Sequence, residues 1–261
     1  MAKESEKRIA INKIFEELHK KSPQSNVLRF DNNKVKEVTG VQFRNQFDAT
    51  KYDSYKSLPH LLKKHGFFII HLGQGEHAFV KGEGFHKFEE VTDIVDWDKF
   101  TENYMDKISK SEAQSASTAF NDQIIHDFLF DDINKDVLIH TARRAKTHYS
   151  FKIGYEKLDT GILQIEMDAV YECGDTIVPV EVKNIEHDDF EIRQLFSSMK
   201  YFEMWKEKGI IPQNMKIRLL FMIRVRKKEK NYYKMYEYRF KDKNDPNSIE
   251  LIKCKKYKIK R

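Results

Sequence analysis

Two short apolar segments joined by a tight turn are the feature that most constrains the fold of this chain. Residues 162–171 and 176–182 are rich in Ile and Val and have the length of β-strands. The four residues 173–176, Cys-Gly-Asp-Thr, supply turn chemistry between them. We therefore expect an antiparallel hairpin in which Glu172 pairs with Ile177.

Polar residues interrupt this hairpin in a regular pattern. Side chains on a strand alternate between its two faces, so Ile165, Met167 and Ala169 are expected on one face. Glu166 and Asp168 are then expected on the opposite face. The first strand thus presents two carboxylates on one face, which is expected to be either exposed to solvent or part of a functional site.

The second strand carries the sequence Val-Glu-Val-Lys, whose valines share a face opposite Glu181 and Lys183. In the expected register, Asp168 lies directly opposite Glu181, about 5 Å away between Cβ atoms. Lys183 then lies opposite Glu166. Pro179 cannot donate to a sheet ladder, and a bulge there would shift this register.

Like charges opposed on neighbouring strands destabilise a sheet unless a cation neutralises them. Hard carboxylate oxygens select Mg²⁺ or Mn²⁺, which lowers the pKa of a bound water and polarises a phosphoryl oxygen. The ammonium of Lys183 suits a water-sized gap beside a phosphate. The pattern predicts a phosphodiester-hydrolysing site in which Asp168 and Glu181 hold the metal. Glu166 competes with Asp168 for the ligand role.

The surrounding segments predict a mixed β-sheet flanked by helices, in the order α-β-β-β-α-β. These segments are a helix at 111–128, strands at 150–155, 162–171 and 176–182, an amphipathic helix at 189–208 and a strand at 215–225.

This order, with Asp168 and Glu181-Val182-Lys183 on the second and third strands, resembles the PD-(D/E)XK nucleases. The resemblance covers residues 111–225. The stretch Phe-Glu-Ile-Arg-Gln-Leu at 190–195 makes the pattern similar to that of type II restriction endonucleases. The Pro that precedes the first Asp in the family pattern is Met167 here.

The resemblance implies that Asp168 and Glu181 are metal ligands and that Lys183 activates or positions the water. It also implies an auxiliary carboxylate on the helix before the sheet, for which Glu112 is the best match, and a polar residue at Gln194. An alternative for Glu112 is a capping box over residues 109–112, Ser-Lys-Ser-Glu.

The implied activity is Mg²⁺-dependent cleavage of double-stranded DNA at a specific short sequence, as in a type II restriction endonuclease. The resemblance further implies a homodimer and a cognate DNA methyltransferase as functional companion. Two alternatives remain open. One is another nuclease on the same core, such as a resolvase or repair nuclease, and the other is a non-enzymatic winged-helix DNA-binding protein.

The N-terminal half, residues 1–108, is expected to be a mostly helical DNA-recognition region, and residues 109–261 the nuclease domain with basic C-terminal strands. Helical segments are expected at 5–21, 34–38 and 54–64, and a hairpin at 67–72 and 77–80. Pro59 delays the start of the third helix. This succession resembles a winged helix-turn-helix.

Arg44, Asn45 and Gln46 carry side chains suited to bidentate contacts with guanine and adenine, so they are candidates for reading the DNA sequence. The helix at 54–64 is a second candidate. The alternative is that this region only packs on the core or mediates dimerisation.

The net charge of +6 favours a polyanionic partner, and its excess lies in residues 224–261, which hold 15 Lys and Arg against five Asp and Glu. The tyrosines of this stretch either stack along a nucleic acid or face the core beneath a solvated strand surface. They are Tyr232, Tyr233, Tyr236, Tyr238 and Tyr257.

Cys173 and Cys254 are too few for a disulfide framework and lack zinc-ligand spacing. No apolar run approaches the roughly 18 residues that span a bilayer, and the first residues lack a signal-peptide core. We expect a soluble cytoplasmic protein that does not bind membranes. The histidines show no ligand spacing, so those at positions 60, 71, 77 and 86 are expected to be surface or packing residues.

Overall fold

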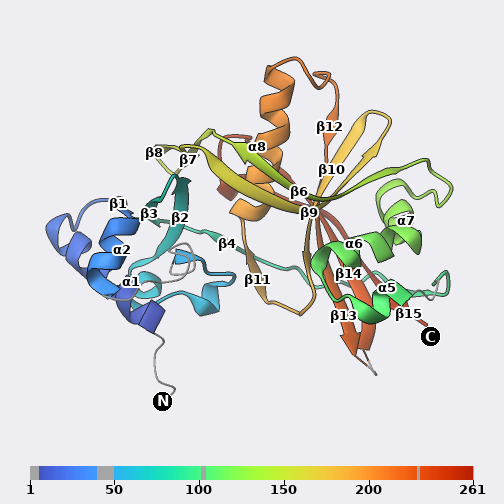
Figure 1. The fold of residues 1–261 in the computed structure, drawn as a ribbon, viewed down its shortest axis with the longest axis horizontal. Helices are drawn as coiled ribbons and strands as arrows, with labels where there is room; N and C mark the ends of the chain where they lie inside the picture. Colours follow the sequence, from blue (N-terminus) through green and yellow to red (C-terminus); the bar gives the residue numbers. More distant parts are fainter. Residues whose placement is uncertain (1–5, 40–49, 101–103, 228–229, 261) are drawn as a thin grey trace.

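The structure is a computed structural model that describes residues 6–39, 50–100, 104–227 and 230–260. These residues form a mixed α/β fold with one large mixed sheet flanked by helices, as the sequence predicted (Figure 1). A smaller three-stranded sheet lies with the N-terminal helices to one side of it.

Residues 6–39 and 50–81 form what we call the N-terminal unit. Its elements are α1 (Glu6–Lys21), β1 (Val27–Asp31), α2 (Asn32–Thr39), the 3-10 helix η1 (Tyr55–Ser57), α4 (His60–His65), β2 (Phe67–Gly73) and β3 (Glu76–Lys81). Strand β3 lies between β1 and β2 and is antiparallel to both. Pro59 is the N-cap of α4, so the third predicted helix begins late, as expected.

The large sheet has eight strands within the described part of the chain. Its order is β5 (Ile94–Trp97), β15 (Ile249–Ile259), β14 (Lys230–Phe240), β13 (Leu219–Lys227), β10 (Thr176–Lys183), β9 (Leu163–Cys173) and β6 (Leu138–Thr147), with β12 (Lys216–Ile217) beside β10. Strand β10 runs parallel to β13 and antiparallel to β9, so the sheet is mixed at the strand that carries Glu181 and Lys183.

Helices cover both faces of this sheet. On one face, α6 (Glu112–Asn121) and α7 (Ile124–Phe130), which follow α5 (Tyr104–Ile108), pack Ala116 and Phe128 into a cluster with Val180. On the other face, α8 (Arg193–Glu207) packs Phe196 into a cluster with Phe221. The remaining elements are β4 (Phe85–Lys87) paired with β11 (Asp189–Glu191), β7 (Ser150–Ile153) paired with β8 (Glu156–Asp159), and η2 (Pro246–Ser248).

Tertiary pairing changes two of the predicted helices. The helix predicted at 111–128 is divided between α6 and α7, because Gln123 takes a left-handed conformation with φ 60°. The helix predicted at 189–208 begins as strand β11, whose backbone pairs with β4. The edge strand β6 was not predicted, since its charged sequence lacks an apolar alternation.

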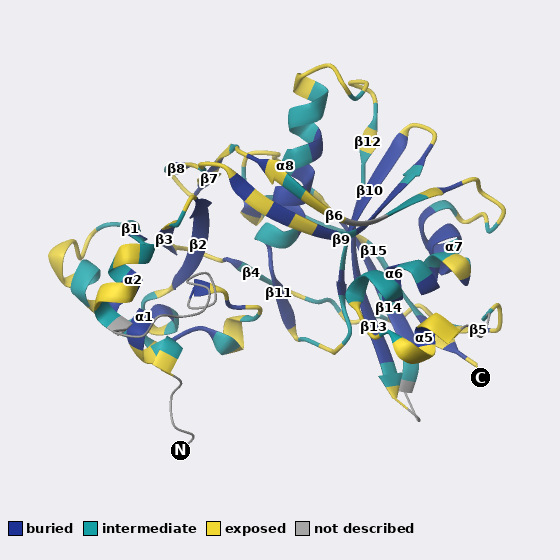
Figure 2. Ribbon diagram, viewed as in Figure 1, coloured by how far each residue is buried: buried dark blue, intermediate teal, exposed yellow. Residues whose placement is uncertain are grey.

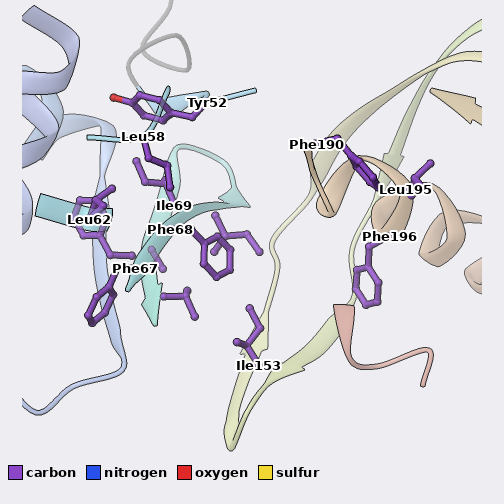
Figure 3. Packing of buried hydrophobic residues seen from close by; sticks show 14 of the residues in the cluster. Tyr52, Leu58, Leu62, Phe67, Phe68, Ile69, Ile153, Phe190, Leu195 and Phe196 are labelled. Atoms are coloured by element: carbon purple, nitrogen blue, oxygen red, sulfur yellow. The ribbon is translucent and has the colours of Figure 1, made fainter. Parts of the chain in front are cut away.

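One continuous apolar core joins the N-terminal unit to the large sheet (Figures 2 and 3). It contains Phe15 and Phe79 from the N-terminal unit, Phe190 and Phe196 from the segment around α8, and Phe221 from β13. Residues on both sides of the predicted boundary near residue 108 also share the large sheet, since β5 pairs with β15. That boundary stays a prediction.

Several basic side chains of the C-terminal strands form ion pairs with acidic residues from other elements. Lys234 pairs with Glu186 at 2.5 Å and Lys255 with Asp127 at 2.9 Å. The five tyrosines of these strands are buried in the core, which is the second of the two alternatives for them. Part of the local excess of positive charge is therefore offset within the described residues.

None of the helices in the described ranges combines the length and apolar character needed to cross a membrane.

The shared core predicts that the described chain unfolds in one cooperative transition. Phe196→Ala and Phe79→Ala should each lower the free energy of unfolding by about 3–5 kcal/mol, because each leaves a cavity in the same core. Tyr155→Ala, at a fully exposed position, should leave the transition unchanged. Thermal unfolding followed by circular dichroism and calorimetry measures this. Two separate transitions, each shifted by only one variant, would contradict a shared core.

Candidate functional site

The hairpin of β9 and β10 has the predicted register up to the residues of the site. Pairing runs from Thr176 with Cys173 to Val180 with Ala169 and includes Glu172 with Ile177. Beyond this point the ladder ends, and the Val182 N–H donates to Asp168 Oδ2 at 2.8 Å instead of to a β9 carbonyl. The two strands separate where Asp168 and Glu181 stand.

Pro179 does not produce the bulge that its missing N–H suggested, because its register with Val170 is regular. On the other side of β10, pairing with β12 ends at Ile177 and pairing with β13 begins at Val180. Pro179 therefore occupies a gap in the ladder where no donor is needed.

The predicted alternation of faces fails at Asp168. Ile165 and Met167 pack in one apolar cluster with Phe202 of α8, whereas Ala169 packs in the cluster beneath α6 and α7. Ala169 thus does not share a face with Ile165 and Met167. Asp168 occupies the position of this change, beside the end of the β9–β10 ladder.

Lys183 is the centre of the polar contacts. Its Nζ lies 2.7 Å from Glu181 Oε1 and 3.3 Å from Glu112 Oε1. The predicted position of Lys183 opposite Glu166 is wrong, because the strands have separated before that pair is reached. Glu166 instead pairs with Arg144 at 2.8 Å, and its side chain is 62% exposed.

Gln194, near the start of α8, donates from Nε2 to Glu181 Oε1 at 2.5 Å. Its carbonyl oxygen, Oε1, is buried and has no hydrogen-bond partner in the described part of the chain. Glu181 Oε1 therefore accepts from both Lys183 and Gln194, while a second hard oxygen lies close by without a donor.

Glu112 is the first residue of α6, whose N-cap is Ser111: the Ser111 hydroxyl accepts from the Gln114 N–H at 3.1 Å. The alternative of a capping box that begins at Ser109 is wrong, since the cap lies two residues later. The Glu112 carboxylate is directed to Lys183 instead.

A polar network that the sequence did not predict fixes the start of α6 to the end of β10. Asn184 follows Lys183 directly, accepts from Ser115 Oγ at 2.6 Å and donates to the Lys110 carbonyl at 2.7 Å. Arg226 of β13 donates to Ser115 Oγ at 2.8 Å. Among the described residues, the sequence signal for this role of Asn184 is its position directly after Lys183.

Burial, together with the crowding of carboxylates, controls the ionisation of the site. Burial and the nearby Glu181 raise the pKa of Asp168 to about 7, against the weaker effect of the Val182 N–H. Burial also raises the pKa of Glu181. Burial alone would lower the pKa of Lys183, but Glu181 and Glu112 raise it, so this ammonium is charged. Glu112, Asp168 and Glu181 thus all interact with the Lys183 ammonium.

These residues line a cavity of about 600 Å³ between the large sheet and the N-terminal unit. The opposite wall carries His71, Gln74 and His77 of the β2–β3 hairpin. His71 and His77 pair across the hairpin, and both are buried, with ring centroids 4.7 Å apart. They are packing residues, as expected. The sequence analysis did not predict that they line the cavity, although their opposed positions in the hairpin indicated that they lie together.

The donor set fits a hard divalent cation. Among the described residues, no three His, Cys, Asp or Glu side chains already form a metal-binding group. However, the carboxylates of Asp168 and Glu181 and the unpartnered oxygen of Gln194 are the oxygen ligands that Mg²⁺ prefers. The negative excess over Lys183 is the charge that such a cation offsets.

The proposed DNA-reading residues Arg44, Asn45 and Gln46 lie outside the described residues. The second candidate reader, the helix predicted at 54–64, is represented by η1 and α4.

Comparison with known proteins divides the chain close to the end of the β2–β3 hairpin. Residues 8–79 match the family described as a domain of unknown function, DUF6996. No curated protein and no solved structure matches this chain. Residues 80–258, which include the strands of the large sheet except for the last residue of β15, as well as Glu112, Asp168, Glu181 and Lys183, match a second such family. The chain therefore belongs to the family of the domain of unknown function DUF6997.

Proposed function

We propose that this protein is a Mg²⁺-dependent endonuclease of the PD-(D/E)XK type that cleaves double-stranded DNA, with the specificity of a type II restriction endonuclease. The observation that carries the proposal is the convergence of Asp168, Glu181 and Lys183 where β9 and β10 separate. Glu112 and Gln194 approach the same residues from helices on opposite faces of the sheet.

Each side chain has a distinct part in the proposed reaction. Asp168 and Glu181 hold the metal, with the Gln194 carbonyl oxygen beside them. When bound, Mg²⁺ supplies charge for the phosphate and a lowered pKa for the attacking water. The Lys183 ammonium orients that water and offsets charge on the phosphate. Glu112 holds Lys183 in place, and the Gln194 amide orients Glu181.

The N-terminal unit supports a winged helix-turn-helix as the DNA-binding part. Its helices precede the β2–β3 hairpin, and β3 pairs with the earlier strand β1. A homodimer and a companion methyltransferase belong to the same proposal, since a restriction endonuclease acts on both strands of a symmetric site and its host must protect its own DNA.

The first test incubates the purified protein with phage DNA and Mg²⁺ and sequences the fragment ends. We expect cleavage at one short sequence. Asp168→Ala and Glu181→Ala should lower the rate by several orders of magnitude and leave duplex binding intact, because the ligands for the metal are lost. EDTA should abolish cleavage, and Mn²⁺ should replace Mg²⁺.

Glu166→Ala is the matched control, since it removes an exposed carboxylate two residues from Asp168 that pairs with Arg144. It should cleave like the wild type. Full activity of Asp168→Ala together with loss in Glu166→Ala would move the ligand role to Glu166. Cleavage of branched or damaged DNA alone points to a resolvase or repair nuclease, and binding without any cleavage points to a non-enzymatic DNA-binding protein.

Two substitutions of Lys183 distinguish the contribution of its positive charge from that of the shape of its ammonium group. Lys183→Ala should be as inactive as the ligand variants, and Lys183→Arg should recover little activity, because a planar guanidinium does not replace a compact ammonium between two carboxylates. Single-turnover cleavage rates measure both. Wild-type rates for Lys183→Arg would show that only the positive charge matters.

The raised pKa of Asp168 makes stability depend on pH. The folded pKa of about 7 lies above the unfolded value, so the folded state binds this proton more tightly and the free energy of unfolding falls as pH rises from about 4 to 7. In EDTA at pH 8, Asp168→Asn should therefore be more stable than the wild type by about 1–3 kcal/mol. The difference should shrink towards pH 5.

Mg²⁺ should reverse this order at pH 8 by stabilising the wild type alone. Thermal unfolding with and without the metal provides a readout that does not depend on cleavage. Glu166→Gln should respond to Mg²⁺ as the wild type does. An Asp168→Asn variant that is less stable than the wild type at pH 8 in EDTA would contradict the crowded, buried carboxylate.

A further inference from the structure

The turn of the β2–β3 hairpin is in close contact with the chain that leads into β9. The Gly161 N–H donates to the Leu72 carbonyl at 2.6 Å. Gly73 has φ +94°, and a Cβ at this position would lie 2.7 Å from the Ile162 carbonyl oxygen. Only glycine fits both the conformation and the space. The hairpin turn is therefore anchored to the segment directly before the strand of Asp168.

This anchoring makes the hairpin a fixed wall of the cavity that contains Asp168 and Glu181. Within the wall, His71 and His77 are neutral at pH 7, because burial lowers the pKa of both, that of His77 to about 4. At its tip, Gln74 is exposed and lines the cavity. The wall thus offers the amide of Gln74 beside the exposed carboxylate of Glu76, which lines the same cavity.

The two walls are chemically different. The sheet side carries crowded carboxylates and Lys183, which suit a metal and a phosphate. The hairpin side offers the Glu76 carboxylate and the amide of Gln74. Of these two, only the amide has both donors and an acceptor without a negative charge, so Gln74 is the group that suits a sugar, a phosphate oxygen or a base edge. A strand whose phosphate lies at Asp168 and Glu181 has to occupy the same cavity as Gln74.

Resting on the proposed nuclease function, we propose that Gln74 contacts the nucleotide beside the scissile phosphate and that the hairpin, anchored through Gly73, positions the strand for cleavage. The N-terminal unit then contributes to the cleavage step itself, in addition to any part in binding the duplex.

The first experiment compares Gln74→Ala with Gln24→Ala, which changes an exposed glutamine of the same unit outside the cavity. We expect Gln74→Ala to lower the single-turnover cleavage rate about tenfold, as for one lost hydrogen bond in the transition state. Its thermal stability should be unchanged. The salt dependence of duplex binding should also be unchanged, because the substitution removes no charged contact with a phosphate.

The second experiment compares Gly73→Ala with Gly174→Ala. Both glycines lie in hairpin turns with positive φ, so both variants carry the backbone cost of alanine. A Cβ on Gly174 meets nothing within 4 Å, whereas a Cβ on Gly73 meets the Ile162 backbone. We expect Gly73→Ala to cleave at least tenfold more slowly than Gly174→Ala because the wall is displaced.

The outcomes separate the two proposals. If the wild type does not cleave DNA with Mg²⁺, the nuclease function fails, and this inference fails with it. If the wild type cleaves and Gln74→Ala cleaves as fast as Gln24→Ala, the inference alone is overturned. Should Gly73→Ala not fold, the stable Gln74→Ala variant decides.

Discussion

Crowding of negative charge at the end of two buried strands is the constraint around which this structure is arranged. Asp168 and Glu181 stand where the β9–β10 ladder ends, in surroundings that penalise both charges. Lys183 offsets part of this charge through Glu181 and Glu112, and its own burial is tolerated for the same reason. Charges of this kind persist in a buried site only when neighbouring elements hold them in place.

Three parts of the fold provide that support. Helix α6 brings Glu112 and is fixed to the end of β10 through Asn184. Helix α8 brings Gln194 from the opposite face. The N-terminal unit closes the cavity with the β2–β3 hairpin. The site therefore depends on helix and hairpin packing as much as on the two strands that carry its carboxylates.

The sequence predicted the parts of the site that local patterns determine. The apolar alternation and turn between residues 162 and 182 predicted the hairpin and its register, since both follow from neighbours in the chain. The same reasoning placed Lys183 opposite Glu166, because alternation carries no information about where two strands separate. The contacts of Asn184 and the position of His77 at the cavity depend on long-range packing, which the local signals at these two residues do not specify.

The core that joins the N-terminal unit to the large sheet limits how such a protein can evolve or be engineered. Phe15 and Phe79 share one apolar cluster with Phe196 and Phe221, and the hairpin turn lies against the Ile162 backbone. Recombination cannot readily replace either unit with one from another protein, because the replacement would have to reproduce these aromatic contacts. Substitutions in the N-terminal unit are therefore tolerated mainly on its outer surface, while its buried face is constrained by the shared core.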